Sequence, residues 1–179
     1  MKKRTRKIII VTSLILIVAV FAVVSVLWCV FYNDNIKPML SNSKLCLSDE
    51  MNGTKNYHYS DSENGIMYDV FVHGFLDFGG NLQVTNVRRT YKGGVFSDII
   101  TKGSNRYYMD FLFIPKLFDD GVFWFSVHFD NVEVAYSVYT DSELKLIDED
   151  IEGTYLEMKE EISEIYQIAI DFWGEDVLD

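Results

Sequence analysis

The chain has 179 residues, a mass of 20.8 kDa and a mean hydropathy of +0.05, enough for one modest domain. Its 16 basic and 27 acidic residues give a net charge of −11. Five basic residues lie in residues 1–7, whereas every acidic residue lies beyond position 33, so residues 33–179 carry 11 − 27 = −16. This distribution excludes a nucleic-acid-binding protein, which needs a basic surface to neutralise phosphates.

An uncharged run from Ile8 to Tyr32 is the most distinctive segment of the chain. At about 1.5 Å per residue, its 25 residues form a helix longer than the roughly 30 Å hydrocarbon layer of a bilayer. Trp28, Phe31 and Tyr32 lie near its end, and such rings favour the headgroup region. We therefore predict a transmembrane helix over residues 8–32.

The charges on either side of this helix predict its orientation. Five cations in residues 1–7 precede the helix and Asp34 follows it, so the positive-inside rule places the N-terminus in the cytoplasm. The prediction is a single-pass signal anchor in the cell membrane, with residues 1–7 as a basic cytoplasmic stub. Residues 33–179 then lie outside the cell.

Three other interpretations fit the apolar run less well. A cleaved signal peptide has a shorter apolar core of about 7–15 residues, followed by small residues at the cleavage site. A lipoprotein needs a small residue before the acylated cysteine, whereas Trp28 precedes Cys29. A core helix of a soluble protein would have a polar face, which this run lacks.

Residues 33–65 form a polar, turn-rich juxtamembrane segment in which we predict one short helix. Apolar residues fall near one helical face between positions 36 and 50, and Pro38 is tolerated in a first turn. The chain has only two cysteines, Cys29 and Cys46, too few for a disulfide-stabilised scaffold. Both are interpreted as small hydrophobic residues, with pairing of Cys46 to its copy in a second chain as the alternative.

Short apolar or alternating runs between residues 66 and 140 predict an antiparallel sheet. These runs are rich in Val, Phe and Tyr, and turn residues separate them. No helical pattern lies between them, which argues against a parallel sheet with crossover helices. We predict six strands, at about 66–78, 81–91, 95–101, 105–114, 121–129 and 132–140.

A two-residue turn at 130–131 predicts the register of the last hairpin, because Asp and Asn suit a type I′ turn. In this register Phe125 lies opposite Tyr136, and His128 lies opposite Glu133. Two-residue alternation then places the large apolar residues of both strands on one face of the sheet. We expect that face to be buried.

Apolar residues at three- and four-residue steps predict an amphipathic helix at about 151–173. Acidic residues precede it, where a helix N-terminus favours negative charge, and Gly174 suits its C-terminal stop. The predicted fold class is α+β: an N-terminal transmembrane helix, then a meander sheet packed by this helix, with the extracytoplasmic domain over 66–179. The apolar stripe of the helix consists of Ile151, Tyr155, Met158, Ile162, Ile165, Ala169 and Phe172.

The three histidines of the chain belong to no recognisable catalytic or zinc-binding motif. His73 shares a strand face with Phe71 and Phe75, so we interpret it as a half-buried structural histidine. We interpret His128 as one member of a cross-strand pair, and His58, like the other two histidines, lies in no metal-binding spacing. The sequence also lacks a nucleophile elbow and a phosphate-binding loop. It therefore assigns no catalytic, cofactor-binding or metal-binding residue.

The acidic segment 148–153 resembles the start of a calcium-binding loop, with carboxylates at alternate positions before Gly153. Lys159 stands where such a loop needs a bidentate glutamate. We therefore predict an acidic helix start, and calcium binding stays as the alternative.

Most of the negative charge lies at the end of the chain, because residues 141–179 hold 14 acidic and 2 basic residues. We interpret this acidity as a solvated helix face, with a surface for a basic partner as the alternative. One basic cluster follows the anchor, at Arg88, Arg89 and Lys92. It suits salt bridges with the helix as well as it suits a ligand.

Three functions fit these features. The first is a membrane-anchored extracytoplasmic domain that binds an envelope protein or a surface ligand, because the sequence shows a topology and a compact domain but no catalytic motif. The second is a small-ligand carrier, since the 13 Phe, 11 Tyr and 3 Trp could line a pocket between sheet and helix. The third is an extracytoplasmic enzyme without a recognisable motif. We predict no enzyme activity and no cofactor, and make no prediction of oligomeric state.

Overall fold

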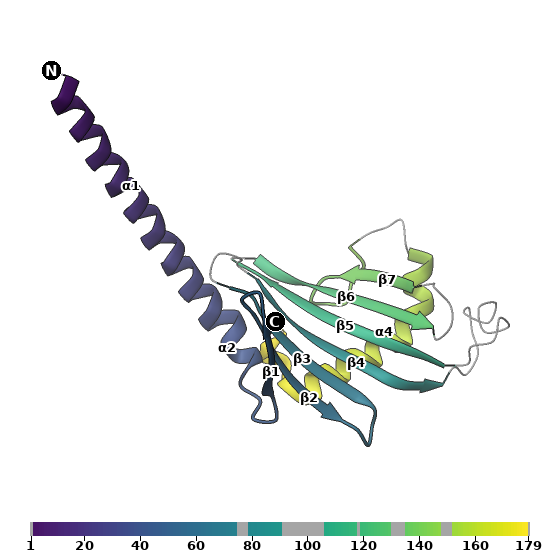
Figure 1. The fold of residues 1–179 in the computed structure, drawn as a ribbon. Coiled ribbons are helices and arrows are strands. Elements are labelled where there is room, and N and C mark those ends of the chain that lie inside the picture. The colour runs from purple at the N-terminus through teal and green to yellow at the C-terminus, as the bar shows by residue number, and fades with distance from the viewer. Residues whose placement is uncertain are drawn as a thin grey trace.

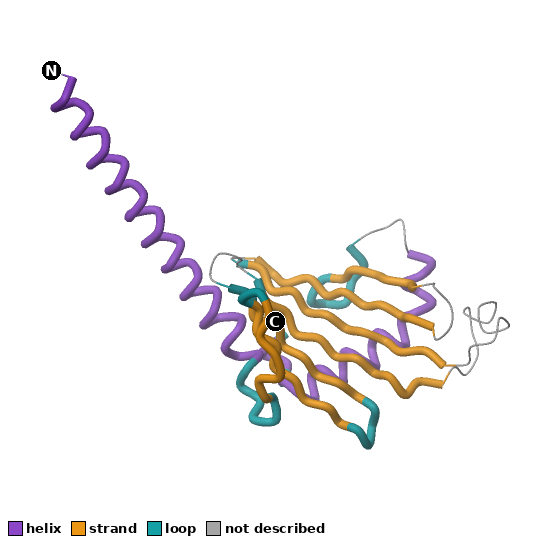
Figure 2. Tube along the Cα trace, viewed as in Figure 1, coloured by secondary structure: helices purple, strands orange, loops and turns teal. Residues whose placement is uncertain are grey.

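A computed structural model describes residues 2–74, 79–90, 106–117, 119–129, 135–147 and 152–178. A long helix, α1 (Lys2–Phe31), projects from a seven-stranded sheet whose strands all pair antiparallel (Figures 1 and 2). A second helix, α4 (Glu152–Trp173), lies along one face of this sheet. The predicted α+β class is confirmed.

Helix α1 carries the uncharged run of the sequence. The helical segment Ile8–Met39 is long and apolar enough to cross a membrane, judged by length and composition. Its first turns stand away from the rest of the molecule, and apolar side chains such as Leu16 and Val18 are more than 60% exposed. The hydroxyls of Thr12 and Ser25 donate to the carbonyls of Ile8 and Phe21, so these polar groups are satisfied within the helix.

The helix does not stop where the apolar run stops. It continues through a π-helical turn, η1 (Tyr32–Ile36), into α2 (Lys37–Met39). The prediction of a helix over 36–50 is therefore correct only for residues 36–39 and wrong beyond them, because the chain turns after Met39 and the first strand begins at Cys46. After the helix the chain turns at Asn42, whose side-chain oxygen accepts a hydrogen bond from the Lys44 N–H.

The strands form a meander in which each one pairs with the next along the chain. The first two lie in the segment predicted to be polar and non-strand, and their hairpin turns at Asn52 and Gly53, both with positive φ. The others match predicted strands, while the predicted strand 95–101 lies outside the described residues. The strands are β1 (Cys46–Met51), β2 (Thr54–Asp61), β3 (Ile66–Val72), β4 (Gly80–Thr90), β5 (Arg106–Lys116), β6 (Asp119–Phe129) and β7 (Ala135–Thr140).

The β6–β7 pairing differs from the predicted register by two residues. Phe125 lies opposite Val138 instead of Tyr136, and His128 lies opposite Ala135 instead of Glu133. Because side chains alternate with a period of two, an even shift keeps every residue on its predicted face. Phe125 and Val138 are accordingly both fully buried. The predicted turn at 130–131 lies outside the described residues.

The core lies between the sheet and α4. The predicted helical stripe is confirmed, since Met158, Ile162, Ile165 and Ala169 are at most 1% exposed, while Ile151 lies outside the described residues. Across from this stripe the sheet presents aromatic side chains with zero to 3% exposure, namely Phe111, Phe113, Phe123 and Phe125. Gly174 follows the helix with φ 93°, as expected for a C-terminal stop.

The end of the N-terminal helix belongs to this same core. Phe31, Ile36 and Met39 are at most 1% exposed, and the indole N–H of Trp173 donates to the Met39 carbonyl over 2.8 Å. On the neighbouring turn, the amide of Asn42 donates to a carbonyl near the end of α4. Residues 31–42, here called the junction segment, therefore tie the N-terminal helix directly to the sheet and to α4.

Tyr68 on β3 makes stability sensitive to alkaline pH. Its ring stacks on Phe172 with centroids 3.8 Å apart, and burial, helped by the charge of Asp61, raises the pKa of the hydroxyl from 10.0 to about 12. The contribution of the neutral hydroxyl is complete below pH 10 and is lost as the pH rises towards 12. Tyr68→Phe should therefore reduce the decline of unfolding free energy over this interval. Titration of unfolding with denaturant checks this, with the exposed Tyr139→Phe as control.

Candidate functional site

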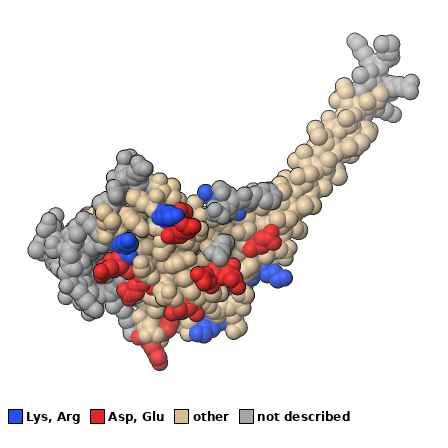
Figure 3. All heavy atoms as spheres, turned by 180° about the vertical axis from the view of Figure 1, so that it is seen from behind, with Lys and Arg blue, Asp and Glu red and all other residues tan. Residues whose placement is uncertain are grey.

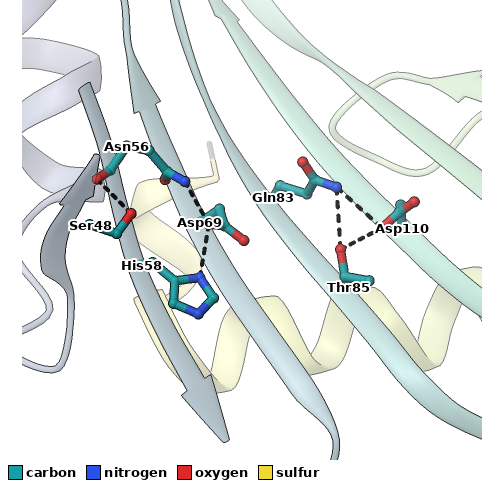
Figure 4. A network of polar contacts seen from close by, with 7 residues as sticks. All are labelled: Ser48, Asn56, His58, Asp69, Gln83, Thr85 and Asp110. Atoms are coloured by element: carbon teal, nitrogen blue, oxygen red, sulfur yellow. Dashed lines mark hydrogen bonds and ion pairs between the residues drawn. The ribbon is translucent and has the colours of Figure 1, made fainter. Parts of the chain in front are cut away.

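The candidate site lies on the face of the sheet opposite α4, here called the free face (Figure 4). Alternation along each strand places polar side chains there, because their neighbours in sequence point into the core. Asp110, for example, lies between the buried Met109 and Phe111. Strand register brings these polar residues together in a row across four strands: Asp69 on β3, Gln83 and Thr85 on β4, Asp110 on β5 and Ser126 on β6.

The centre of this row is the carboxylate of Asp110, whose side chain is only 10% exposed. The Thr85 hydroxyl donates to Asp110 Oδ1, and the Gln83 amide donates to the same oxygen over 3.2 Å and to the Thr85 hydroxyl oxygen, also over 3.2 Å. Charge-assisted hydrogen bonds of this kind offset the cost of burying a carboxylate. The carboxylate is therefore held in one position.

His128 lies beside this carboxylate. Its Nε2 is 2.9 Å from the Ser126 hydroxyl and 3.6 Å from Asp110 Oδ2, and its ring stacks on Tyr108 with centroids 4.7 Å apart. The residue types are those of a serine-hydrolase triad, but the geometry is not. In a triad the two ring nitrogens serve the hydroxyl and the carboxylate separately, whereas here Nε2 faces both. Ser126 is also fully buried and so closed to a substrate.

A second polar group lies further along the free face, towards the edge strand β1 (Figure 4). Asp69 Oδ1 is 2.9 Å from His58 Nδ1 and accepts from the Asn56 amide over 3.2 Å. The Ser48 hydroxyl donates to the Asn56 carbonyl, which links this group to β1. The backbone carbonyl of Asn56 thus connects Ser48 on the exposed edge strand with the group formed by the Asn56, His58 and Asp69 side chains.

The structure keeps the three histidines apart and gives each a separate role. His58 pairs with Asp69, His128 with Ser126 and Asp110, and the backbone N–H of His73 donates to Gly79. Sequence reasoning missed the environment of His128, because Asp110 and Tyr108 come from a different strand. Across the described ranges no three His, Cys, Asp or Glu side chains are grouped to hold a metal ion. The calcium-like residues 148–151 and Lys92 lie outside those ranges.

The opposite side of the molecule is acidic. Figure 3 shows carboxylates gathered over the side that α4 covers, and Glu160, Glu164 and Asp171 on this helix are exposed. Their exposure matches the prediction of a solvated helix face. The two faces of the sheet therefore differ, because one is covered by an acidic helix and the other holds a largely buried row of hydrogen-bonded polar groups with His58 and His128 partly exposed beside it.

Comparison with protein-family models, with curated proteins and with solved structures gives no match for this chain.

Thr85→Val tests whether the central polar group is as rigid as its hydrogen bonds indicate. The substitution keeps the side-chain shape but removes a donor from a carboxylate that is nearly buried. We expect the free energy of unfolding to fall by about 1–3 kcal/mol. Denaturant titration of the full chain in detergent micelles measures this, and Ser137→Ala, an exposed site on the same face, should change stability by less than about 0.5 kcal/mol.

Proposed function

We propose that this protein is a single-pass, membrane-anchored extracytoplasmic domain that binds an envelope protein through the free face of its sheet. The observation that carries the proposal is the asymmetry of the sheet. Helix α4 covers one face, whereas the other presents His58 and His128, with side chains 34% and 30% exposed and held by the carboxylates of Asp69 and Asp110, on the same face as the partly exposed ring of Tyr139. Prepositioned polar groups next to aromatic side chains are typical of protein interfaces.

The apolar part of the free face supports a partner in the same membrane. Leu112, Trp124 and Tyr139 lie side by side on β5, β6 and β7, and Tyr139 is 45% exposed. One residue pair further along, Ile114 is 39% exposed opposite Val122. The register of β4 and β5 places Ile114 near Gly80, the first residue of β4. Ile36 of the junction segment packs at Gly80, so the apolar pairs and the junction segment lie at the same end of the sheet. The apolar surface is thus at the membrane-proximal end, within reach of a partner anchored nearby.

The junction segment supports an anchor that is retained. Phe31, Ile36 and Met39 are part of the domain core, so the domain begins inside the helix that carries the apolar run. Cleavage within the last turns of this run would remove core residues. The basic residues 1–7 support a cytoplasmic N-terminus, as the positive-inside rule requires.

The two other functions have less support. A carrier needs a cavity between sheet and helix, but there the ring of Tyr166 on α4 lies 5.8 Å from Phe111 and 5.3 Å from Phe123, centroid to centroid. Side chains therefore occupy the centre of that interface. An enzyme needs an accessible reactive group, and Ser126 beside His128 is fully buried.

Photo-crosslinking in living cells tests the proposed surface. A photoreactive phenylalanine at position 139, on the free face, should give one discrete adduct, which mass spectrometry identifies as an envelope protein. The same group at position 156 is the matched control, because Leu156 is 60% exposed on α4. Substitution of Trp124 by alanine should lower the yield at position 139. Equal yields at both positions, or no adduct at position 139, would contradict the proposal.

Protease treatment of intact cells tests the orientation independently. A tag at the C-terminus should be removed if residues 33–179 lie outside the cell. A tag that stays protected until the cells are lysed would overturn the proposed topology.

A further inference from the structure

A shallow, open surface groove of about 370 Å³ runs along the C-terminal part of the N-terminal helix, whose one face supplies all of its described lining. Its residues lie four apart in two neighbouring rows, which places them on one face of the helix. The part of the groove nearer the N-terminus is mainly apolar, and the two residues at its C-terminal end are polar. The described lining consists of Ser25, Val26, Cys29, Val30, Asn33 and Asp34.

The change from apolar to polar lining coincides with the end of the membrane-spanning run. Val26 is 62% exposed and Val30 is 36% exposed, so the wall of the groove is continuous with the surface that the helix offers to lipid chains. Asn33 and Asp34 follow directly after Tyr32, the last residue of the uncharged run. An occupant must therefore be apolar within the membrane and polar at the headgroup level, as a phospholipid is.

The polar end of the groove offers hydrogen-bond acceptors. The Asn33 amide group donates to the Cys29 carbonyl over 2.7 Å, which leaves its own carbonyl oxygen free to accept. Asp34 is exposed and makes no ion pair with the part of the chain that the structure describes. A carboxylate next to an amide oxygen attracts a cationic N–H donor and repels an anionic headgroup.

We infer that this groove binds a phospholipid with a primary ammonium headgroup, phosphatidylethanolamine, whose ammonium group contacts Asp34 and Asn33 while an acyl chain lies along Val26 and Val30. A primary ammonium has three N–H donors, whereas the quaternary ammonium of phosphatidylcholine has none. The inference rests on the proposed function to the extent that the helix must be in a membrane.

Native mass spectrometry of the full-length protein tests the site. The protein is purified in mild detergent with an equimolar mixture of phosphatidylethanolamine and phosphatidylglycerol, and the retained lipids are counted. We expect phosphatidylethanolamine to be preferred, and Asp34→Asn to reduce its retention about three- to fivefold, as for loss of a partly exposed ion pair. Asp49→Asn, an exposed acid on β1, should leave retention unchanged.

A second pair of variants tests the apolar wall. Val30→Trp should fill the groove and displace the lipid, whereas Val23→Trp, at a 59% exposed position outside the groove, should not. Equal retention in Asp34→Asn and the unchanged protein, or equal retention of both lipids, would overturn the lipid site alone. Absence of the protein from the membrane fraction would instead refute the proposed anchor, so the two failures are distinguishable.

Discussion

Replacing Phe111 with alanine should lower the free energy of unfolding by about 3–5 kcal/mol, among the largest effects expected in this chain. Phe111 is fully buried at the middle of β5, and its ring centroid lies 5.0 Å from that of Phe125 and 5.3 Å from that of Phe123. It also meets Tyr166 from α4. The substitution therefore opens a cavity at the contact between the sheet and the helix.

Denaturant unfolding of the full chain in detergent micelles, followed by tryptophan fluorescence, measures this loss. Domains of this size have about 5–15 kcal/mol of stability, so the variant would be partly unfolded under ordinary conditions if the lower value applies. Val87→Ala is the control, because Val87 on β4 is 46% exposed and should cost less than about 0.5 kcal/mol. A loss below about 1 kcal/mol in the Phe111 variant would show that the described core contact is wrong.

Ile36→Ala should lower the free energy of unfolding by about 2–5 kcal/mol and loosen the junction segment. Ile36 is fully buried although it follows the uncharged run of residues 8–32 by only four residues. A protease should then cut between α2 and β1 faster than in the unchanged protein, because the segment loses its main apolar contact. Lys37→Ala, an exposed position on the next residue, should change neither stability nor cleavage rate. An uncut junction segment in the Ile36 variant would contradict the proposed packing.

Gly80 allows the contact with Ile36 to be tested from the other side. A Cβ at position 80 would lie 2.3 Å from the Ile36 Cδ1 and 2.9 Å from the Phe71 carbonyl oxygen, closer than real Cβ atoms approach. Gly80→Ala should therefore cost about 1–3 kcal/mol. In the Ile36→Ala background the same substitution should cost at least about 0.5 kcal/mol less, since one of the two clashes is gone. Strict additivity would show that the two residues do not touch.

Much of the fold could be predicted from the sequence, because most strands and helix α4 bury apolar side chains on one face only. In β3, the alternation of Tyr68, Val70 and Val72 with less buried neighbours follows from a sheet covered on one side only. The apolar spacing of Met158, Ile162 and similar residues similarly located α4. The absence of charge over residues 8–32 located the long helix. In each case a large apolar area repeats at a fixed period, and this repetition is what sequence reasoning detects.

The elements that could not be predicted, such as β1 and the junction segment, lack a repeating pattern of apolar residues. Every residue of β1 is exposed, so its strand conformation comes from pairing with β2 and leaves no burial pattern in the sequence. The sequence predicts a polar break at residues 33–35, between the apolar helix and a short helix from residue 36, because Asn33, Asp34 and Asn35 resemble a chain leaving the membrane. The side-chain amides of both Asn33 and Asn35 instead donate to backbone carbonyls four residues earlier, and the helix continues through this segment.

The residues of the candidate site could be found in the sequence, but their arrangement in space could not be predicted. The polar residues of β4, β5 and β6 are visible in the sequence, but the row that they form depends on the register between strands, which places Asp110 opposite both Thr85 and Ser126. The partnership of Asp110 with Thr85 spans 25 residues and has no local signal. The predicted pairing of His128 with Glu133 failed for the related reason that it assumed the shortest possible turn.

The contact between Trp173 and Met39 affects how the chain folds during its synthesis, because the two residues are made at very different times. Each strand of the meander can pair with the one synthesised just before it, so the sheet can grow while the ribosome is still working. Helix α4 is made after all seven strands, and its Trp173 bonds to Met39, 134 positions earlier, at the end of the N-terminal helical segment. Until α4 has been made, one face of the growing sheet exposes the row of phenylalanines that the helix later covers. The core is therefore completed only once α4 has been made, and chains that stop before α4 should be substrates for quality-control proteases.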